Sequence, residues 1–147
     1  MIVNTAYIYM GAGGGGGGTP ANPNLWQDGV SNYPVVFTGD CSISADGLNF
    51  IQKPGDATFS ELTLTQFNSL TLSGRTSAPG ANPKVEIGIE FYSSDNVLIG
   101  TTTATFSKSG NSVTVNIPSS AKIQNAKIKI KKAAYGYPST LTSAVLS

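Results

Sequence analysis

The sequence contains no histidine and one cysteine, Cys41, among its 147 residues. A single cysteine excludes an internal disulfide, and the lack of histidine excludes nucleophilic catalysis of the Ser–His–Asp type. A zinc site of the usual Cys/His kind is excluded for the same reason. We therefore expect the Cys41 thiol to pack as a small apolar group, and we expect no cofactor.

Charge is also scarce, because Asp, Glu, Lys and Arg make up 12% of the residues and the net charge is +1. A chain so close to neutral has no broad attraction for nucleic acid or for an anionic membrane surface. No stretch approaches the ~18 consecutive apolar residues that predict a membrane span. Residues 1–10 lack the positively charged start of a signal peptide. We expect no nucleic-acid partner, no membrane insertion, and synthesis in a cytoplasm without the general export route.

Catalytic motifs are missing as well. The run Gly13–Gly18 is not a phosphate-binding loop, because Thr19-Pro20 follows it where a Walker motif needs Gly-Lys-Ser/Thr. Glu86 and Glu90 lie on one face of a predicted strand, roughly 13 Å apart, which is farther than the paired carboxylates of glycosidases. We interpret them as partners of lysines on a neighbouring strand. The sequence predicts a protein that is not an enzyme.

Five acidic residues lie in contexts typical of turns: Asp28, Asp40, Asp46, Asp56 and Asp95. Turn formation accounts for them at least as well as calcium, which needs several oxygen ligands from one loop. We therefore expect no metal site. Structural calcium is the alternative, and Asp28 and Asp40 are the best of the five candidates for its ligands.

What the sequence does contain is alternation of apolar and polar residues with the period of a β-strand. The segments KVEIGIEFY, NSVTVNI and NAKIKIKK show it most clearly, and they place one set of side chains inward. The predicted core is Val85, Ile87, Ile89, Phe91, Val113, Val115, Ile128 and Ile130. In the last segment the lysines alternate with the core positions, so they face outward.

Other segments predict further strands, namely SLTLSG, VLIGTTTATF and LTSAVLS, and the shorter YPVVFTG, CSISADG and LNFIQK. We expect Gly39-Asp40 and Asp46-Gly47 to separate the short strands, and Asp95-Asn96 to form a tight hairpin turn. No window of helical length has an apolar stripe. About eight to ten short strands of this kind predict an all-β fold, an antiparallel two-sheet jelly-roll sandwich.

An N-terminal arm precedes this domain. Residues 1–10 are predicted to form a strand, residues 11–23 a Gly/Pro-rich linker, and residues 24–147 the sandwich. A single strand is not stable alone in water, so we expect the arm to add to a sheet elsewhere. The residues predicted to anchor it in an assembly are Ile2, Val3, Tyr7, Ile8 and Tyr9.

Two surface features are candidates for binding. Lys127, Lys129 and Lys131 form an outward stripe, which indicates either an edge or surface strand kept soluble by lysine or a docking site for an acidic partner. Five aromatic residues are candidates for stacking on sugar rings: Trp26, Tyr33, Tyr92, Tyr135 and Tyr137. Core packing is the alternative for Trp26, whereas the last two tyrosines lie in AAYGYPS, which is typical of an exposed loop.

From Asn24 onward, NLWQDGV, LTLTQFNSLTLSGRTS and NSVTVNIPSSAKIQNAKIKI resemble segments of galactose-binding-like jelly-roll modules. Such modules occur in bacteriophage structural proteins and in carbohydrate-binding modules. A short strand followed by poly-glycine also resembles the arms of phage virion proteins.

The resemblance implies a virion accessory or fibre-type protein, such as a capsid decoration, head-fibre or tail accessory protein. Other virion proteins would hold it through residues 1–23, and it would be located in the virion as a homo-oligomer, with a trimer expected. The alternative that it implies is an adsorption module that binds host surface glycans.

Overall fold

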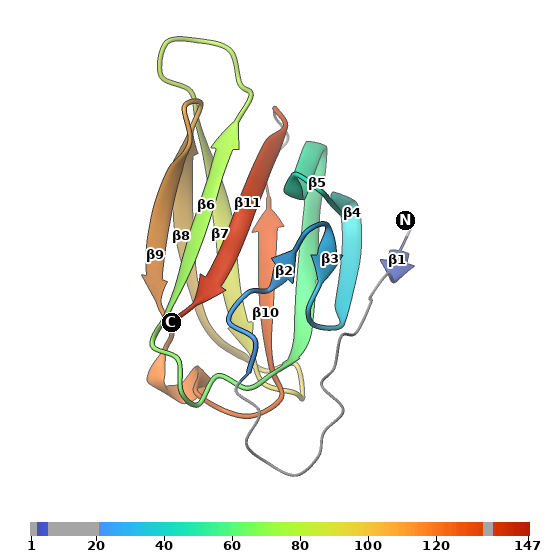
Figure 1. The fold of residues 1–147 in the computed structure, drawn as a ribbon, viewed down its shortest axis with the longest axis vertical. Helices are drawn as coiled ribbons and strands as arrows, with labels where there is room; N and C mark the ends of the chain where they lie inside the picture. Colours follow the sequence, from blue (N-terminus) through green and yellow to red (C-terminus); the bar gives the residue numbers. More distant parts are fainter. Residues whose placement is uncertain (1–2, 6–20, 134–136) are drawn as a thin grey trace.

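The computed structural model describes residues 3–5, 21–133 and 137–147 (Figure 1). Its strands are β1 Val3–Thr5, β2 Trp26–Gln27, β3 Val30–Ser31, β4 Val35–Ser44, β5 Gly47–Leu62, β6 Ser69–Thr76, β7 Lys84–Tyr92, β8 Leu98–Ser107, β9 Asn111–Asn116, β10 Ala126–Lys132 and β11 Ser139–Leu146. One 3-10 turn, η1, spans Ser119–Ala121. The described residues contain no α-helix, and the predicted all-β fold is confirmed.

The strands form a β-sandwich whose two layers share β5. The hydrogen-bonded order is β8-β7-β10-β5-β11-β6-β9, and β4 pairs with β5 outside this path. The second half of β5 pairs with β10, while its first half pairs with β11. One layer therefore consists of β8, β7, β10 and the end of β5, and β6, β9 and β11 build the other (Figure 1).

A corner in β4 and β5 carries the chain from one layer to the other. Their pairing shifts register between Gly39 and Cys41. Gly39 has a φ of 72°, and a Cβ there would lie 2.3 Å from the carbonyl oxygen of Pro54. A Cβ on Gly55 would lie 2.9 Å from the backbone of Asp40. Both glycines are needed because the two backbones approach too closely for side chains.

This corner corrects two strand boundaries predicted from the sequence. We expected Gly39-Asp40 to end a strand, but β4 continues through it as an irregularity in the pairing. The second half of β5, residues 55–62, was not predicted as a strand at all. Pro54 and Gly55, at the start of this half, form the corner.

The predicted core is confirmed between the layers. Six of its eight members are buried, namely Ile87, Ile89, Phe91, Val115, Ile128 and Ile130. Val85 and Val113 are partly buried and pack against them.

Cys41 is buried as expected, and desolvation together with the charge of Asp56 raises the pKa of its thiol. The hairpin at Asp95-Asn96 is also confirmed, because the Ser93 N–H donates to the Val97 carbonyl at 3.0 Å.

The described part of the N-terminal arm lies on the sheet of its own domain. Val3 pairs with Thr38 and Thr5 with Val36, so β1 runs antiparallel along the outer edge of β4. We had expected the arm to add to a sheet elsewhere. Of the residues predicted to anchor an assembly, Ile2, Tyr7, Ile8 and Tyr9 lie outside the described residues. Within the described part of the chain, no helix has the length and apolar character needed to cross a membrane.

Candidate functional site

The outward face of β7 and β10 brings the predicted lysine stripe beside the predicted glutamates. The register pairs Lys127 with Tyr92, Lys129 with Glu90 and Lys131 with Gly88. Because β10 lies between β7 and β5, the stripe lies in the middle of its layer. Of the prediction that the stripe lies on an edge or surface strand, the edge position is therefore wrong and the surface position is confirmed. Strand order depends on long-range pairing, which alternation does not reveal.

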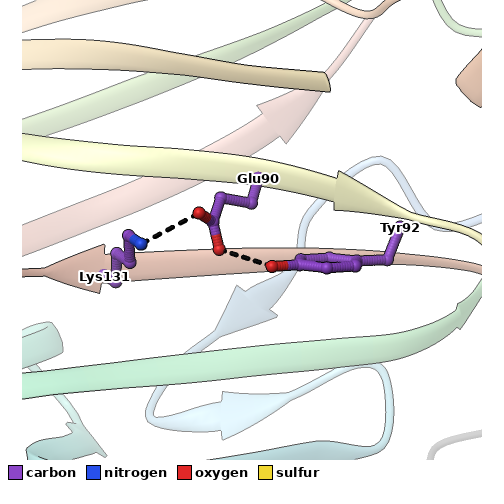
Figure 2. Close-up of polar contacts among 3 residues, drawn as sticks. All are labelled: Glu90, Tyr92 and Lys131. Atoms are coloured by element: carbon purple, nitrogen blue, oxygen red, sulfur yellow. Dashed lines mark hydrogen bonds and ion pairs between the residues drawn. The ribbon is translucent and has the colours of Figure 1, made fainter. Parts of the chain in front are cut away.

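Glu90 is the centre of a polar row on this face (Figure 2). The Lys131 ammonium donates to its Oε2 at 2.9 Å, and the Tyr92 hydroxyl donates to its Oε1 at 2.7 Å. Both carboxylate oxygens are thus engaged. Within the described residues Lys131–Glu90 is the one ion pair within 4.0 Å. The interpretation of the glutamates as lysine partners is confirmed for Glu90, whereas Glu86 has no such pair in the part of the chain that the structure describes.

These bonds fix the protonation states of the row. Burial alone would raise the pKa of Glu90, but the hydrogen bonds from Lys131 and Tyr92 outweigh it and lower that pKa. The hydrogen bond to Glu90, with a smaller contribution from burial, raises the pKa of Tyr92 to about 12. The row therefore holds an ionised carboxylate and a neutral phenol at neutral pH.

The other two lysines are also held in place. The Lys129 ammonium lies 5.3 Å from the centroid of the Tyr92 ring, which is a cation–π geometry. The Lys127 ammonium donates to Asn96 Oδ1 at 2.7 Å. Asp56 of β5 lies opposite Lys131 on the other side of β10. Burial raises the pKa of Asp56, although the charges of Lys129 and Lys131 oppose that shift.

A groove with a volume of about 490 Å³ lies over this face at the end nearer the start of β7. Its lining includes Glu90 and Lys131, Thr101 and Thr103 of β8, and Tyr137, which is 53% exposed. The two threonines lie opposite Glu90 and Gly88, so their side chains share the outward face. The groove thus combines hydroxyl, carboxylate and ammonium groups with one exposed aromatic ring.

The five predicted sugar-contacting aromatics do not form one surface. Trp26 and Tyr33 are 4% and 7% exposed, so neither ring is available for stacking at the surface. The Trp26 ring stacks on Phe59 with 5.9 Å between centroids, which confirms the core-packing alternative. Tyr33 donates from its hydroxyl to the Asn22 carbonyl at 2.6 Å. For these two residues the predicted role is corrected, since their apolar rings fill the sandwich.

The remaining three aromatics lie in different places. Tyr137 lines the groove, whereas Tyr92 contributes to it through its bond to Glu90. Tyr135 lies outside the described residues. Sequence reasoning missed Gly88, Thr101 and Thr103, because their role depends on the pairing of β7 with its neighbours. The alternation of threonines in TTTATF was the available signal, since it predicts a polar row on one face.

The two candidate calcium ligands each have a local structural role. Asp40 Oδ2 accepts a hydrogen bond from the Lys53 N–H at 3.1 Å, and Asp28 lies in a turn with a φ of 53°. Among the described residues, no three His, Cys, Asp or Glu side chains form a group that could hold a metal ion. Turn and corner formation account for both aspartates.

The fold matches solved carbohydrate-binding modules. A family 11 module from Clostridium thermocellum, in complex with a β-1,3-1,4-mixed-linked tetrasaccharide, matches with a TM-score of 0.54 and 10% identity, over 88% of this chain and 96% of that chain. A module described as CBM28 and specific for non-crystalline cellulose matches with a TM-score of 0.55 and 11% identity, over 88% and 95%. Identities this low establish the fold alone. The chain has their jelly-roll β-sandwich fold.

No protein-family model matches the chain, and no curated protein matches its sequence.

Proposed function

We propose that this chain is a non-enzymatic carbohydrate-binding domain and that its ligand lies in the groove on the outward face of β7, β8 and β10. The observation that carries the proposal is the groove itself, about 490 Å³ in volume, with Tyr137 at the surface beside Glu90, Lys131, Thr101 and Thr103. Ligand sites typically pair such a concavity with a few fixed polar groups.

The lining groups suit the chemistry of a sugar. A sugar ring presents hydroxyls at its edge and C–H bonds on its faces, so it needs donors, acceptors and an aromatic platform. Glu90 accepts hydrogen bonds, Lys131 donates them, and the threonine hydroxyls do both. Tyr137, which is 53% exposed, offers an aromatic ring. Because Glu90 and Lys131 already hold each other, they would meet a ligand with little loss of side-chain freedom.

The fold and the state of Glu90 support binding rather than hydrolysis. The family 11 module that matches this fold was solved with a tetrasaccharide, and the CBM28 module is specific for non-crystalline cellulose. A glycosidase needs an acid whose pKa is raised toward neutrality. Glu90, which lines the groove, has a pKa that its two hydrogen bonds lower instead. Asp56, whose pKa burial raises, is not among the residues that line the groove.

The experiment is affinity electrophoresis of the full chain through gels that contain neutral or acidic soluble polysaccharides. We expect at least one polysaccharide to retard the protein. Tyr137→Ala should weaken that binding roughly tenfold, because it removes the stacking surface. Ile51→Ala is the matched control, since Ile51 is 51% exposed and does not line the groove. Failure of every polysaccharide to retard the protein contradicts the proposal.

A second candidate is a structural role in a virion, in which the N-terminal arm anchors the domain. One observation favours it: β1 adds to the outer edge of β4 by backbone pairing, and this edge would accept the same strand from another copy. In this role the full chain would be an oligomer, with a trimer expected, and a chain lacking residues 1–23 would be a folded monomer. Mass measurement of both proteins tests the role, and an oligomeric truncated chain would contradict it.

A further inference from the structure

Three hollows meet at one end of the sandwich, where the β6–β7 loop, the β8–β9 turn and the start of β11 gather (Figure 1). The first is the groove. The second has a volume of about 280 Å³ and shares Lys84 with the groove. The third has a volume of about 340 Å³ and shares Lys108 with the second. The shared residues make the three hollows one continuous surface.

We name this surface the basic end and define it by its charged lining residues: Arg75, Lys84, Lys108, Lys131, Lys132, Glu86 and Glu90. These are five of the nine basic and two of the eight acidic residues of the chain. Four basic and six acidic residues lie elsewhere. The near-neutral total of +1 thus hides a formal charge of +3 at this end and −2 on the rest of the molecule.

Two of the five cations already have partners within the protein. Lys131 is paired with Glu90 at 2.9 Å. Lys132 is 2% exposed, and its ammonium donates to the carbonyl oxygens of Ile51 and Gln52 at 3.4 and 3.3 Å. The charges of these two lysines are thus already engaged within the protein and contribute less to the attraction of a charged ligand.

The other three cations are exposed: Arg75 on β6, Lys84 at the start of β7, and Lys108 in the β8–β9 turn. In the described part of the chain none of the three has a carboxylate within 4.0 Å. They come from three different elements, yet all line the hollows around one loop. An unpaired, convergent set of cations beside a groove favours a ligand of opposite charge.

We infer that the glycan bound at this surface is anionic, with carboxylate or sulfate groups on its sugars, and this inference rests on the proposed carbohydrate binding. One sugar lies in the groove against Tyr137, and charged groups of the neighbouring sugars meet Lys84, Lys108 and Arg75. Arginine binds a carboxylate or sulfate through two parallel hydrogen bonds, and lysine acts as a point charge.

The test compares polysaccharides that differ in charge. The carboxylate arm uses polygalacturonate against its fully methyl-esterified form, and the sulfate arm uses dextran sulfate against dextran. We expect the protein to bind at least one charged polymer at least tenfold more tightly than its neutral form. Raising the ionic strength from about 0.02 M to about 0.3 M should weaken that binding, because exposed charges are screened by salt.

Variants connect the effect to the basic end. The triple variant Arg75→Gln, Lys84→Gln, Lys108→Gln should lose roughly tenfold in affinity for the charged polymer, since each exposed ion pair contributes modestly. The double variant Lys53→Gln, Lys122→Gln is the control and should bind as the unchanged protein does, because neither lysine lines the hollows. Thermal unfolding of each variant verifies that it is folded.

The outcomes separate this inference from the proposed function. Equal binding of charged and neutral polymers, or no effect of the triple variant, overturns the anionic ligand and leaves carbohydrate binding intact. Binding of no polysaccharide overturns both. Binding of double-stranded DNA as tightly as of the charged polysaccharides overturns the inference too, since the surface would then bind polyanions in general and not anionic glycans.

Discussion

Gly88 of β7 lies directly opposite Lys131 of β10, and the lysine side chain crosses the space above the glycine. A Cβ at position 88 would approach Lys131 Cγ to 3.3 Å and Cε to 3.4 Å. The missing side chain leaves space for the Lys131 side chain to lie across β7, where its ammonium donates to Glu90 at 2.9 Å. The glycine in β7 therefore contributes to the shape of the groove, because it leaves space for a lysine of the neighbouring strand.

The first prediction concerns Gly88→Val. The larger side chain displaces Lys131, so Glu90 loses one of the two hydrogen bonds that lower its pKa, and that pKa should rise toward its ordinary value. The measurement is an NMR pH titration of the Glu90 carboxyl carbon. Thr103→Val is the control, because Thr103 lines the same groove but, among the described residues, Glu90 is hydrogen-bonded by Lys131 and Tyr92 and not by Thr103. An unchanged Glu90 titration in Gly88→Val would contradict the role assigned to the glycine.

The second prediction concerns acid stability. Because the pKa of Glu90 is lower in the folded than in the unfolded protein, its ionisation contributes stability that is complete above the unfolded pKa and is lost as the pH falls through the folded one. Glu90→Gln removes this contribution, so its unfolding free energy should fall less steeply in acid than that of the unchanged protein. Urea unfolding at a series of pH values measures the slopes, and identical slopes would sink the prediction.

The third prediction concerns alkaline titration. The hydrogen bond to Glu90 raises the pKa of Tyr92 to about 12, so the neutral phenol stabilises the fold below the unfolded pKa of about 10. That stability is lost as the pH rises through about 12. In Glu90→Gln the hydrogen bond to an ionised carboxylate is gone, and Tyr92 should titrate closer to pH 10.

Ultraviolet difference titration of the tyrosines follows the change, and Tyr92→Phe identifies which step belongs to this residue. If Tyr92 titrates at the same pH with and without the Glu90 carboxylate, burial rather than the hydrogen bond sets its pKa.

Local alternation predicted the strands and the core well. Ile87 and Ile89 of β7 and Ile128 and Ile130 of β10 are buried as expected. In a half-buried strand, the period of two decides which face of the sheet each side chain lies on. The same reasoning placed Glu90 and the lysines outward. Those parts of the site that lie along one strand could therefore be read directly from the sequence.

The features that the sequence did not predict depend on contacts between distant segments. The sequence left open whether the lysine stripe lies on an edge or a surface strand, since nothing local reveals that β10 pairs with both β7 and β5. Trp26 was a candidate for the surface until the packing against Phe59 placed it in the core. The corner was missed for a related reason: Gly39 and Gly55 look like loop residues until the two strands are laid side by side.

The last prediction tests that corner. Gly39→Ala places a Cβ 2.3 Å from the carbonyl oxygen of Pro54 in a backbone with a φ of 72°. The conformation alone should cost about 1–3 kcal/mol of unfolding free energy, and the clash adds to it because both backbones are fixed by pairing on either side. Gly80→Ala is the matched control: its φ is 116°, yet nothing lies within 4 Å of the added Cβ.

Urea unfolding of the two variants separates strain from clash. We expect Gly39→Ala to lose clearly more stability than Gly80→Ala, since only the first forces β4 away from β5 at the point where the sheet passes between layers. The same displacement should reach Lys132, whose ammonium is held by the Ile51 and Gln52 carbonyls of that corner. Equal losses in the two variants would mean that the corner relaxes freely and does not require glycine at position 39.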